Sequence, residues 1–135
     1  MASILKVDAL QGITSAGDIT VTSEGGAATQ SLQQGLAKMW TKADQTGTVE
    51  IDDSFNTSSI TDFGTGLMNF TAVNNMSSIH YIVSLCYQPV ATNAGSDHFN
   101  VFANQSTASN EARHFENNNT YDLNDRTSMR HGDLA

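Results

Sequence analysis

The sequence predicts a mainly β protein, with a β-sandwich or jelly-roll-like domain in its C-terminal part. Short runs of alternating apolar and polar residues recur along the chain, separated by turns rich in glycine, asparagine and serine. Only 15% of the residues are charged, which is fewer than disordered chains usually carry. The 135 residues are enough for one domain that buries roughly two-thirds of its unfolded surface.

Residues 1–26 are predicted to form short β segments joined by turns. Ile19 and Val21 alternate with threonines, and glycines bound this run on both sides. Large apolar residues are too few here for the segment to fold alone. We therefore expect an N-terminal arm that packs on something else.

One short helix is predicted over residues 27–40, because four apolar residues would share one of its faces. Gly35 would cost about 1 kcal/mol relative to alanine inside this helix. The helix could pack against copies of itself around a threefold axis, or lie at the surface as an ordinary helix. The apolar stripe consists of Leu32, Leu36, Met39 and Trp40.

The pattern of the remaining chain is β throughout, so we expect the arm and linker helix over residues 1–40 and an outer domain over residues 41–135. The run "GTVEID" (47–52) alternates like a strand, and "LMNFTAV" (67–73) resembles a returning strand. Between them we expect a polar excursion and then a tight turn at "DFGTG" (62–66), because glycine adopts positive φ at no steric cost.

Residues 79–87, "IHYIVSLCY", give the clearest strand signal, and both faces of this strand carry apolar groups. We expect both faces to be covered. A domain of this size fills one face of each sheet, so a second apolar face predicts an interface between subunits. Other predicted strands are 97–104 and, from weaker patterns, 111–117 and 121–123, with 127–135 closing the chain.

The charge of the chain disfavours nucleic acid and anionic membranes as partners. Six basic and 14 acidic side chains give a net charge of −8, and no basic cluster is present. No apolar stretch has the length of a signal peptide or a membrane-spanning helix, so we expect no membrane insertion. Cys86 is the single cysteine, which excludes an intrachain disulfide.

No pattern in the sequence predicts an enzyme, a cofactor or a metal site. A nucleophile elbow and a phosphate-binding loop are both missing, and the adjacent Asp52 and Asp53 would point to opposite faces of a strand. The four histidines lack metal-ligand spacing, although a threefold axis could gather one of them from each copy. Exposed aromatic residues could stack on sugar rings, or could simply fill the core or an interface. The aromatic candidates are Trp40, Tyr87, Phe115 and Tyr121.

Several stretches together resemble short tail-fibre-like or fibre-like virion structural proteins of tailed phages that infect marine bacteria. The resemblance covers most of the chain and is weakest over residues 88–126. The matching stretches are "MASILKVD", "GDITVTSEGG", "SLQQGLAKMW", "GTVEIDDSFNTSSITDFGTG", "LMNFTAVNNMSS" and "HGDLA".

This resemblance implies a non-enzymatic virion component, a homotrimer with a β-sandwich-like C-terminal domain, whose arm attaches to capsid or tail. The chain is much shorter than tail fibres proper, which favours a short capsid fibre, a decoration protein or a fibre-tip subunit. An alternative role for the same domain is recognition of host-surface carbohydrate. Degradation of that carbohydrate is the third hypothesis.

Overall fold

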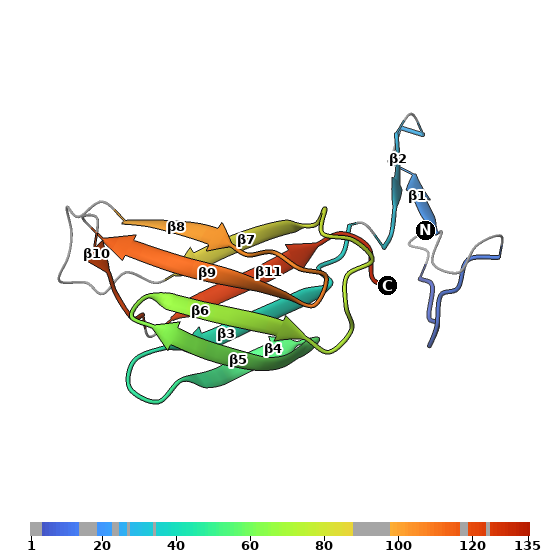
Figure 1. The fold of residues 1–135 in the computed structure, drawn as a ribbon. Coiled ribbons are helices and arrows are strands. Elements are labelled where there is room, and N and C mark those ends of the chain that lie inside the picture. Colours follow the sequence, from blue (N-terminus) through green and yellow to red (C-terminus); the bar gives the residue numbers. More distant parts are fainter. Residues whose placement is uncertain are drawn as a thin grey trace. The chain divides into compact units, whose positions relative to one another are not determined.

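The structure is a computed structural model that describes residues 4–13, 19–22, 25–26, 28–33, 35–87, 98–116, 119–123 and 125–135. These residues form antiparallel sheets and no helix, so the mainly β class is confirmed (Figure 1). None of them forms a helix that is long and apolar enough to cross a membrane. The strands are β1 (Thr20–Thr22), β2 (Thr29–Ser31), β3 (Met39–Asp44), β4 (Glu50–Phe55), β5 (Thr57–Gly64), β6 (Leu67–Ala72), β7 (Ile82–Tyr87), β8 (His98–Ala103), β9 (Ser109–Glu116), β10 (Asn119–Thr120) and β11 (Arg126–His131).

The predicted helix over residues 27–40 is wrong. Leu32 and Leu36 lie outside any strand, whereas Met39 and Trp40 are neighbours in β3 and therefore point to opposite faces of a sheet. The helical spacing of these four residues arises by chance. The strand prevails because β3 is hydrogen-bonded on both sides, to β4 and to β11.

The chain divides into two compact units, Met1–Leu36 and Ala37–Ala135. In the first unit, β1 and β2 pair as an antiparallel hairpin, and the amide of Leu32 donates to the carbonyl of Ile19 at 2.7 Å. The stretch 4–13 forms neither helix nor strand and leaves its large apolar side chains exposed to solvent. These side chains are Ile4, Leu5, Val7, Leu10 and Ile13.

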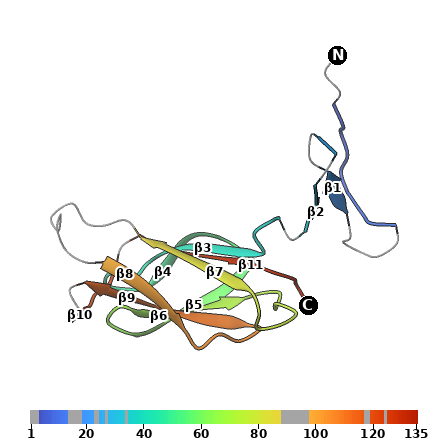
Figure 2. The same ribbon diagram turned by 90° about the horizontal axis from the view of Figure 1, so that it is seen from above.

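The second unit consists of two antiparallel sheets that lie in two layers (Figures 1 and 2). The first sheet has the strand order β4-β3-β11-β7, and the second has the order β10-β9-β6-β5 with β8 also paired to β9. Where we expected a polar excursion after β4, the chain forms β5 instead. The serines and threonines of β5 are compatible with a strand because its outer face is wet.

Asn56 carries the chain from the first sheet into the second. Its φ of 57° lies in the left-handed region, which asparagine tolerates better than most residues. Its Nδ2 donates to the carbonyl of Lys38 at 2.8 Å, and its Oδ1 accepts from the amide of Asn74 at 2.8 Å. Asn56 therefore joins three segments at one corner of the unit.

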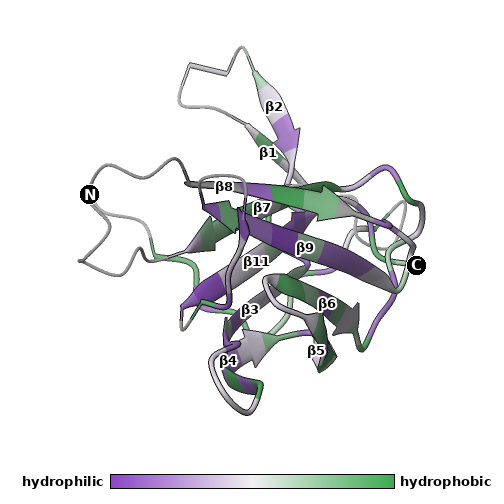
Figure 3. Cartoon of the chain, turned by 60° about the vertical axis from the view of Figure 1, so that its left-hand side comes forward, coloured by the Kyte–Doolittle hydropathy of each residue, from purple (hydrophilic) through white to green (hydrophobic). Residues whose placement is uncertain are grey.

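The core between the sheets is unusually polar. β6 contributes Met68, Phe70 and Ala72, whereas β11 contributes Arg126, Ser128 and Arg130, because alternate residues of "RTSMRH" point inward. Coloured by hydropathy, the strands of the two sheets carry both hydrophilic and hydrophobic residues (Figure 3). Other buried polar residues are Thr41, Gln45, Asn110 and His114.

Each buried arginine donates to a carbonyl oxygen of the opposite sheet. Arg130 donates to Asn110 Oδ1 at 2.6 Å and to the carbonyl of Phe70 at 2.6 Å. Arg126 donates to Gln45 Oε1 and to the carbonyl of Ala112. Burial lowers the pKa of Arg126 to about 10 and also lowers the pKa of Arg130. These bonds tie the two sheets together through polar contacts.

Candidate interaction surface

The outer face of the first sheet carries two rows of opposed side chains. The strand register places Phe55, Trp40, Met129 and Ser84 in one row across β4, β3, β11 and β7. The adjacent row consists of Asp53, Lys42, Thr127 and Cys86. Residues opposed in this way share a face, so the first row forms an apolar strip that we call the Trp40 row. Phe55 and Met129 in this row are exposed.

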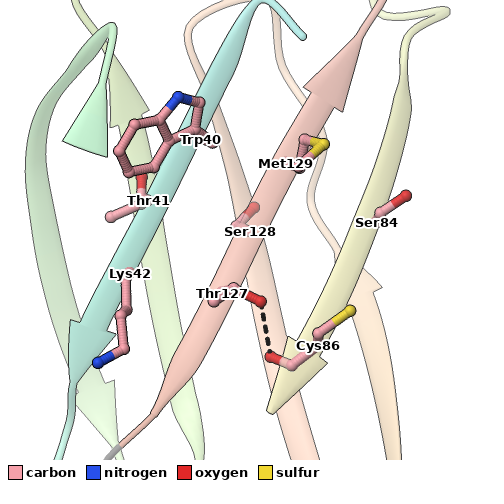
Figure 4. A pocket seen from close by; sticks show the side chains of 8 residues that line it. All are labelled: Trp40, Thr41, Lys42, Ser84, Cys86, Thr127, Ser128 and Met129. Atoms are coloured by element: carbon pink, nitrogen blue, oxygen red, sulfur yellow. Dashed lines mark hydrogen bonds between the residues drawn. The ribbon is translucent and has the colours of Figure 1, made fainter. Parts of the chain in front are cut away.

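A shallow groove of about 210 Å³ runs along this face (Figure 4). Trp40 and Lys42 come from β3, Thr127 and Met129 from β11, and Ser84 and Cys86 from β7. A second hollow of about 220 Å³ shares Lys42, Cys86 and Thr127 with the first and adds Tyr87 and Asp125. The two hollows therefore form one continuous surface.

Lys42, which belongs to the second row, lies between the carboxylates of two neighbouring aspartates. Its Nζ is 2.6 Å from Asp125 Oδ1 and 3.1 Å from Asp52 Oδ2. The hydrogen bonds to Asp125 and Asp52 raise the pKa of Lys42, so it stays charged at neutral pH. One positive charge therefore lies between two negative ones, and Asp53 in the same row adds a further negative charge to this part of the face.

The side chains on this face suit contact with a partner molecule. Cys86 is exposed and its side chain is a free thiol. In the part of the chain that the structure describes, no three His, Cys, Asp or Glu side chains gather where they could hold a metal ion. The groove instead offers an indole, a thioether and hydroxyl groups, which suit an apolar partner with a few hydrogen-bonding groups.

The four residues predicted as a helix stripe are separated by the fold. Met39 lies in the core and Trp40 on the outer face of the first sheet. Leu36 is exposed and Leu32 is half-buried in the first unit. Among these residues only Trp40 belongs to the interaction surface.

The three other aromatic candidates do not form a single site. The ring of Tyr87 packs on the buried ring of His114, with centroids 4.6 Å apart. Phe115 lies below the guanidinium of Arg113, which is 6.0 Å from its ring centroid. Tyr121 is exposed beyond β10.

The sequence reasoning missed Phe55 and Met129 as surface residues. The parity of β11 carried the signal, because placing Arg126 and Arg130 inside forces Met129 outward. No rule based on hydropathy alone would choose that parity.

Comparison with known proteins gives no further guide: no protein family, no curated protein and no solved structure matches this chain.

Proposed function

We propose that this protein is a non-enzymatic structural component of a phage particle that works as a homotrimer. The observation that carries the proposal is the apolar Trp40 row on the outer face of a sheet, which a single copy leaves exposed to water. Contiguous apolar surface of this kind marks interaction sites. The resemblance to short fibre-like virion proteins supplies the type of assembly.

In this proposal the second unit is a jelly-roll-like β-sandwich that faces outward. Two facing sheets with a shared core support that architecture. Within this unit the chain begins and ends at one end: the amide of Lys38 bonds to the carbonyl of Arg130, and Met76 pairs with Leu134 near the C-terminus. The opposite end is therefore free of chain termini and suits an outward tip.

The first unit is the proposed attachment arm, which docks on another capsid or tail protein. The exposed side chains of the stretch 4–13 support this role, because burying an apolar side chain of this size stabilises a complex by roughly 1.5–3 kcal/mol. The stretch 4–13 contains one basic and one acidic residue, Lys6 and Asp8, so this stretch adds little net charge to the contact.

The test is to measure the copy number of the protein in purified phage particles by quantitative mass spectrometry. We expect the unmodified chain in the particles, and we expect particles of the double variant Leu5→Asp and Val7→Asp to lose it. Phe63→Glu, which adds charge on β5, is the control and should be retained. Absence of the unmodified chain from the particles would refute the proposal.

A second candidate function, recognition of host-surface carbohydrate, is favoured by Tyr121. Its exposed ring lies beyond β10, near the turn at Gly66, at the end opposite the C-terminus. Binding of the purified protein to host cells, lost in Tyr121→Ala, would support this role. Equal cell adsorption by the two proteins would exclude Tyr121 as a receptor contact.

A further inference from the structure

The outer face of the second sheet carries a positive charge among apolar side chains. The strand register places Leu67 of β6, Arg113 of β9 and Val101 of β8 side by side. Arg113 is exposed between two buried neighbours in β9, so its side chain points outward. The Arg113 guanidinium also lies 6.0 Å from the ring centroid of Phe115, the next outward residue of β9. We call these four residues the Arg113 platform.

Arg113 is the basic residue of the second unit that remains available to a ligand. Lys38, Arg126 and Arg130 are buried. Lys42 is paired with two aspartates. Among the described residues Arg113 forms no ion pair with a carboxylate. In a chain with a net charge of −8, an exposed guanidinium that no carboxylate neutralises attracts an anionic group of a partner.

A row of hydrogen-bonding side chains lies beside the Arg113 platform on the same face. The register opposes Thr61 of β5, Asn69 of β6 and Glu111 of β9. Asn69 and Glu111 each lie two residues from a platform residue of the same strand, so they share its face. Glu111 Oε2 accepts from Asn104 Nδ2 at 2.7 Å, which leaves the other carboxylate oxygen able to accept from a ligand. The row therefore offers a hydroxyl, an amide and a carboxylate to a partner that carries hydroxyl groups.

The outer face of the first sheet does not suit an anionic ligand. There Lys42 is outnumbered by the aspartates around it, so this part of the face is negative. Beside the Arg113 platform a single positive charge is accompanied by Glu111, two residues away in β9. An anionic ligand is therefore repelled by the first face and can approach the second.

We infer that the Arg113 platform binds the carboxylate of an acidic sugar in host-surface carbohydrate. This inference rests on the second candidate function and names its ligand class. A guanidinium binds a carboxylate through two parallel hydrogen bonds. The apolar side chains around it suit the C–H face of a sugar ring, and the adjacent row suits the ring hydroxyls. One cation beside neutral and acidic hydrogen-bonding groups fits a ligand with one charge and many hydroxyls better than an acidic peptide with several carboxylates.

The platform lies near Tyr121, the residue that favours the second candidate function. A Cβ on Gly66 would lie 2.9 Å from the carbonyl of His114 and 2.9 Å from backbone atoms of Tyr121. The backbone at Tyr121 therefore passes beside the residue that follows Arg113. An extended carbohydrate chain at this end of the unit can span both contacts.

Three variants of the full chain test the role of Arg113 in adsorption to host cells. Arg113→Gln removes the charge, and Arg113→Lys keeps the charge but loses the guanidinium fork. Val73→Asp is the matched control, because Val73 is 62% exposed and the change lowers the net charge by the same one unit. Circular dichroism and light scattering check that each variant keeps its fold and its molar mass.

We expect Arg113→Gln to weaken adsorption by about tenfold or more, because one charge-assisted contact is lost. Arg113→Lys should fall between Arg113→Gln and the unmodified chain, and Val73→Asp should adsorb normally. If the unmodified chain does not adsorb to host cells, the second candidate function itself fails. If it adsorbs and Arg113→Gln adsorbs equally well, only the present inference is overturned.

Competition with soluble oligosaccharides identifies the group that Arg113 binds. Oligomers of galacturonic acid should inhibit adsorption of the unmodified chain about tenfold or more better than their methyl esters, which lack the charge. Equal inhibition by acid and ester would overturn the inference. Stronger inhibition by polyglutamate than by the galacturonic acid oligomers would assign the platform to an acidic peptide, and equal inhibition by a sulfated neutral oligosaccharide would show that any anion suffices. Either result would overturn the assignment to a sugar carboxylate.

Discussion

Replacing the buried Arg130 by methionine tests whether hydrogen bonds across the core hold the two sheets together. The Arg130 side chain is fully buried and reaches three oxygen atoms, Asn110 Oδ1, the carbonyl of Phe70 and the carbonyl of Ala108. Methionine keeps an unbranched side chain but donates no hydrogen bond. The change therefore removes the donors while leaving much of the volume filled.

The size of the effect follows from the acceptors that lose a partner. The Ala108 carbonyl also accepts from the amide of Ala72 at 2.8 Å, so it stays bonded. Phe70 pairs with Asn110 in the ladder between β6 and β9, so its carbonyl keeps a backbone partner. Asn110 Oδ1 loses its charged donor, and an orphaned buried group costs about 1–3 kcal/mol. Removing a buried guanidinium, whose pKa burial already lowers, offsets part of this loss. We expect Arg130→Met to reduce the free energy of unfolding by about 2 kcal/mol.

A double-mutant cycle with Asn110→Leu separates the polar interaction from packing. Asn110 Nδ2 has no hydrogen-bond partner among the described residues, so without Arg130 its amide would be unsatisfied at both ends. Replacing both partners by apolar groups can be nearly neutral. The double variant should therefore recover about 1–2 kcal/mol relative to Arg130→Met.

Urea unfolding followed by far-ultraviolet circular dichroism measures these differences, with equal m-values as the check on a common two-state transition. A loss below about 1 kcal/mol in Arg130→Met would refute the reasoning, because it would be smaller than the cost of one orphaned acceptor. Strict additivity in the cycle would likewise show that Arg130 and Asn110 are not coupled.

Three further predictions concern single residues. Burial raises the pKa of Tyr81, whose hydroxyl donates to the carbonyl of Ser106 at 2.8 Å. An absorbance titration of the unmodified protein should therefore show a phase above the range of free tyrosine, and Tyr81→Phe should remove that phase. The pKa of Tyr81 is higher in the folded than in the unfolded chain, so the free energy of unfolding that Tyr81 contributes below pH 10 should be lost as pH rises further. The same loss of stability at high pH in Tyr81→Phe would contradict this. Asn56→Ala should reduce the free energy of unfolding in urea by about 2–4 kcal/mol, and Asn56→Gly should reduce it less. Both variants lose the corner hydrogen bonds, but only glycine adopts the positive φ without strain. Equal losses in the two variants would argue against backbone strain. Gly66→Ala should lower the thermal midpoint strongly, because its Cβ would lie 2.9 Å from backbone atoms of His114 and Tyr121; an unchanged midpoint would mean that this turn can move.

The positions of most strands could be predicted from alternation. β6, β8 and β9 lie within two residues of the segments expected at 67–73, 97–104 and 111–117. β7 begins only at Ile82, which pairs with His131, the last residue of β11. Alternation succeeds where a strand has one wet and one buried face, which is the rule for antiparallel sheets.

The polar core could not be predicted, because hydropathy assigns charged residues to the surface. In β11 the buried residues are two arginines and a serine, whereas the apolar Met129 is exposed. That choice depends on acceptors supplied by β6 and β9, which are distant in sequence. The helix prediction failed for a related reason: the pairing of β3 with β4 and β11 outweighs local spacing.

The molar mass of the unmodified full chain in solution, measured by light scattering over a range of concentrations, tests the central claim most directly. If the apolar Trp40 row is covered by a sister copy, the mass should reach three times the 14.5 kDa of one chain. A mass of 14.5 kDa at every concentration would contradict the account.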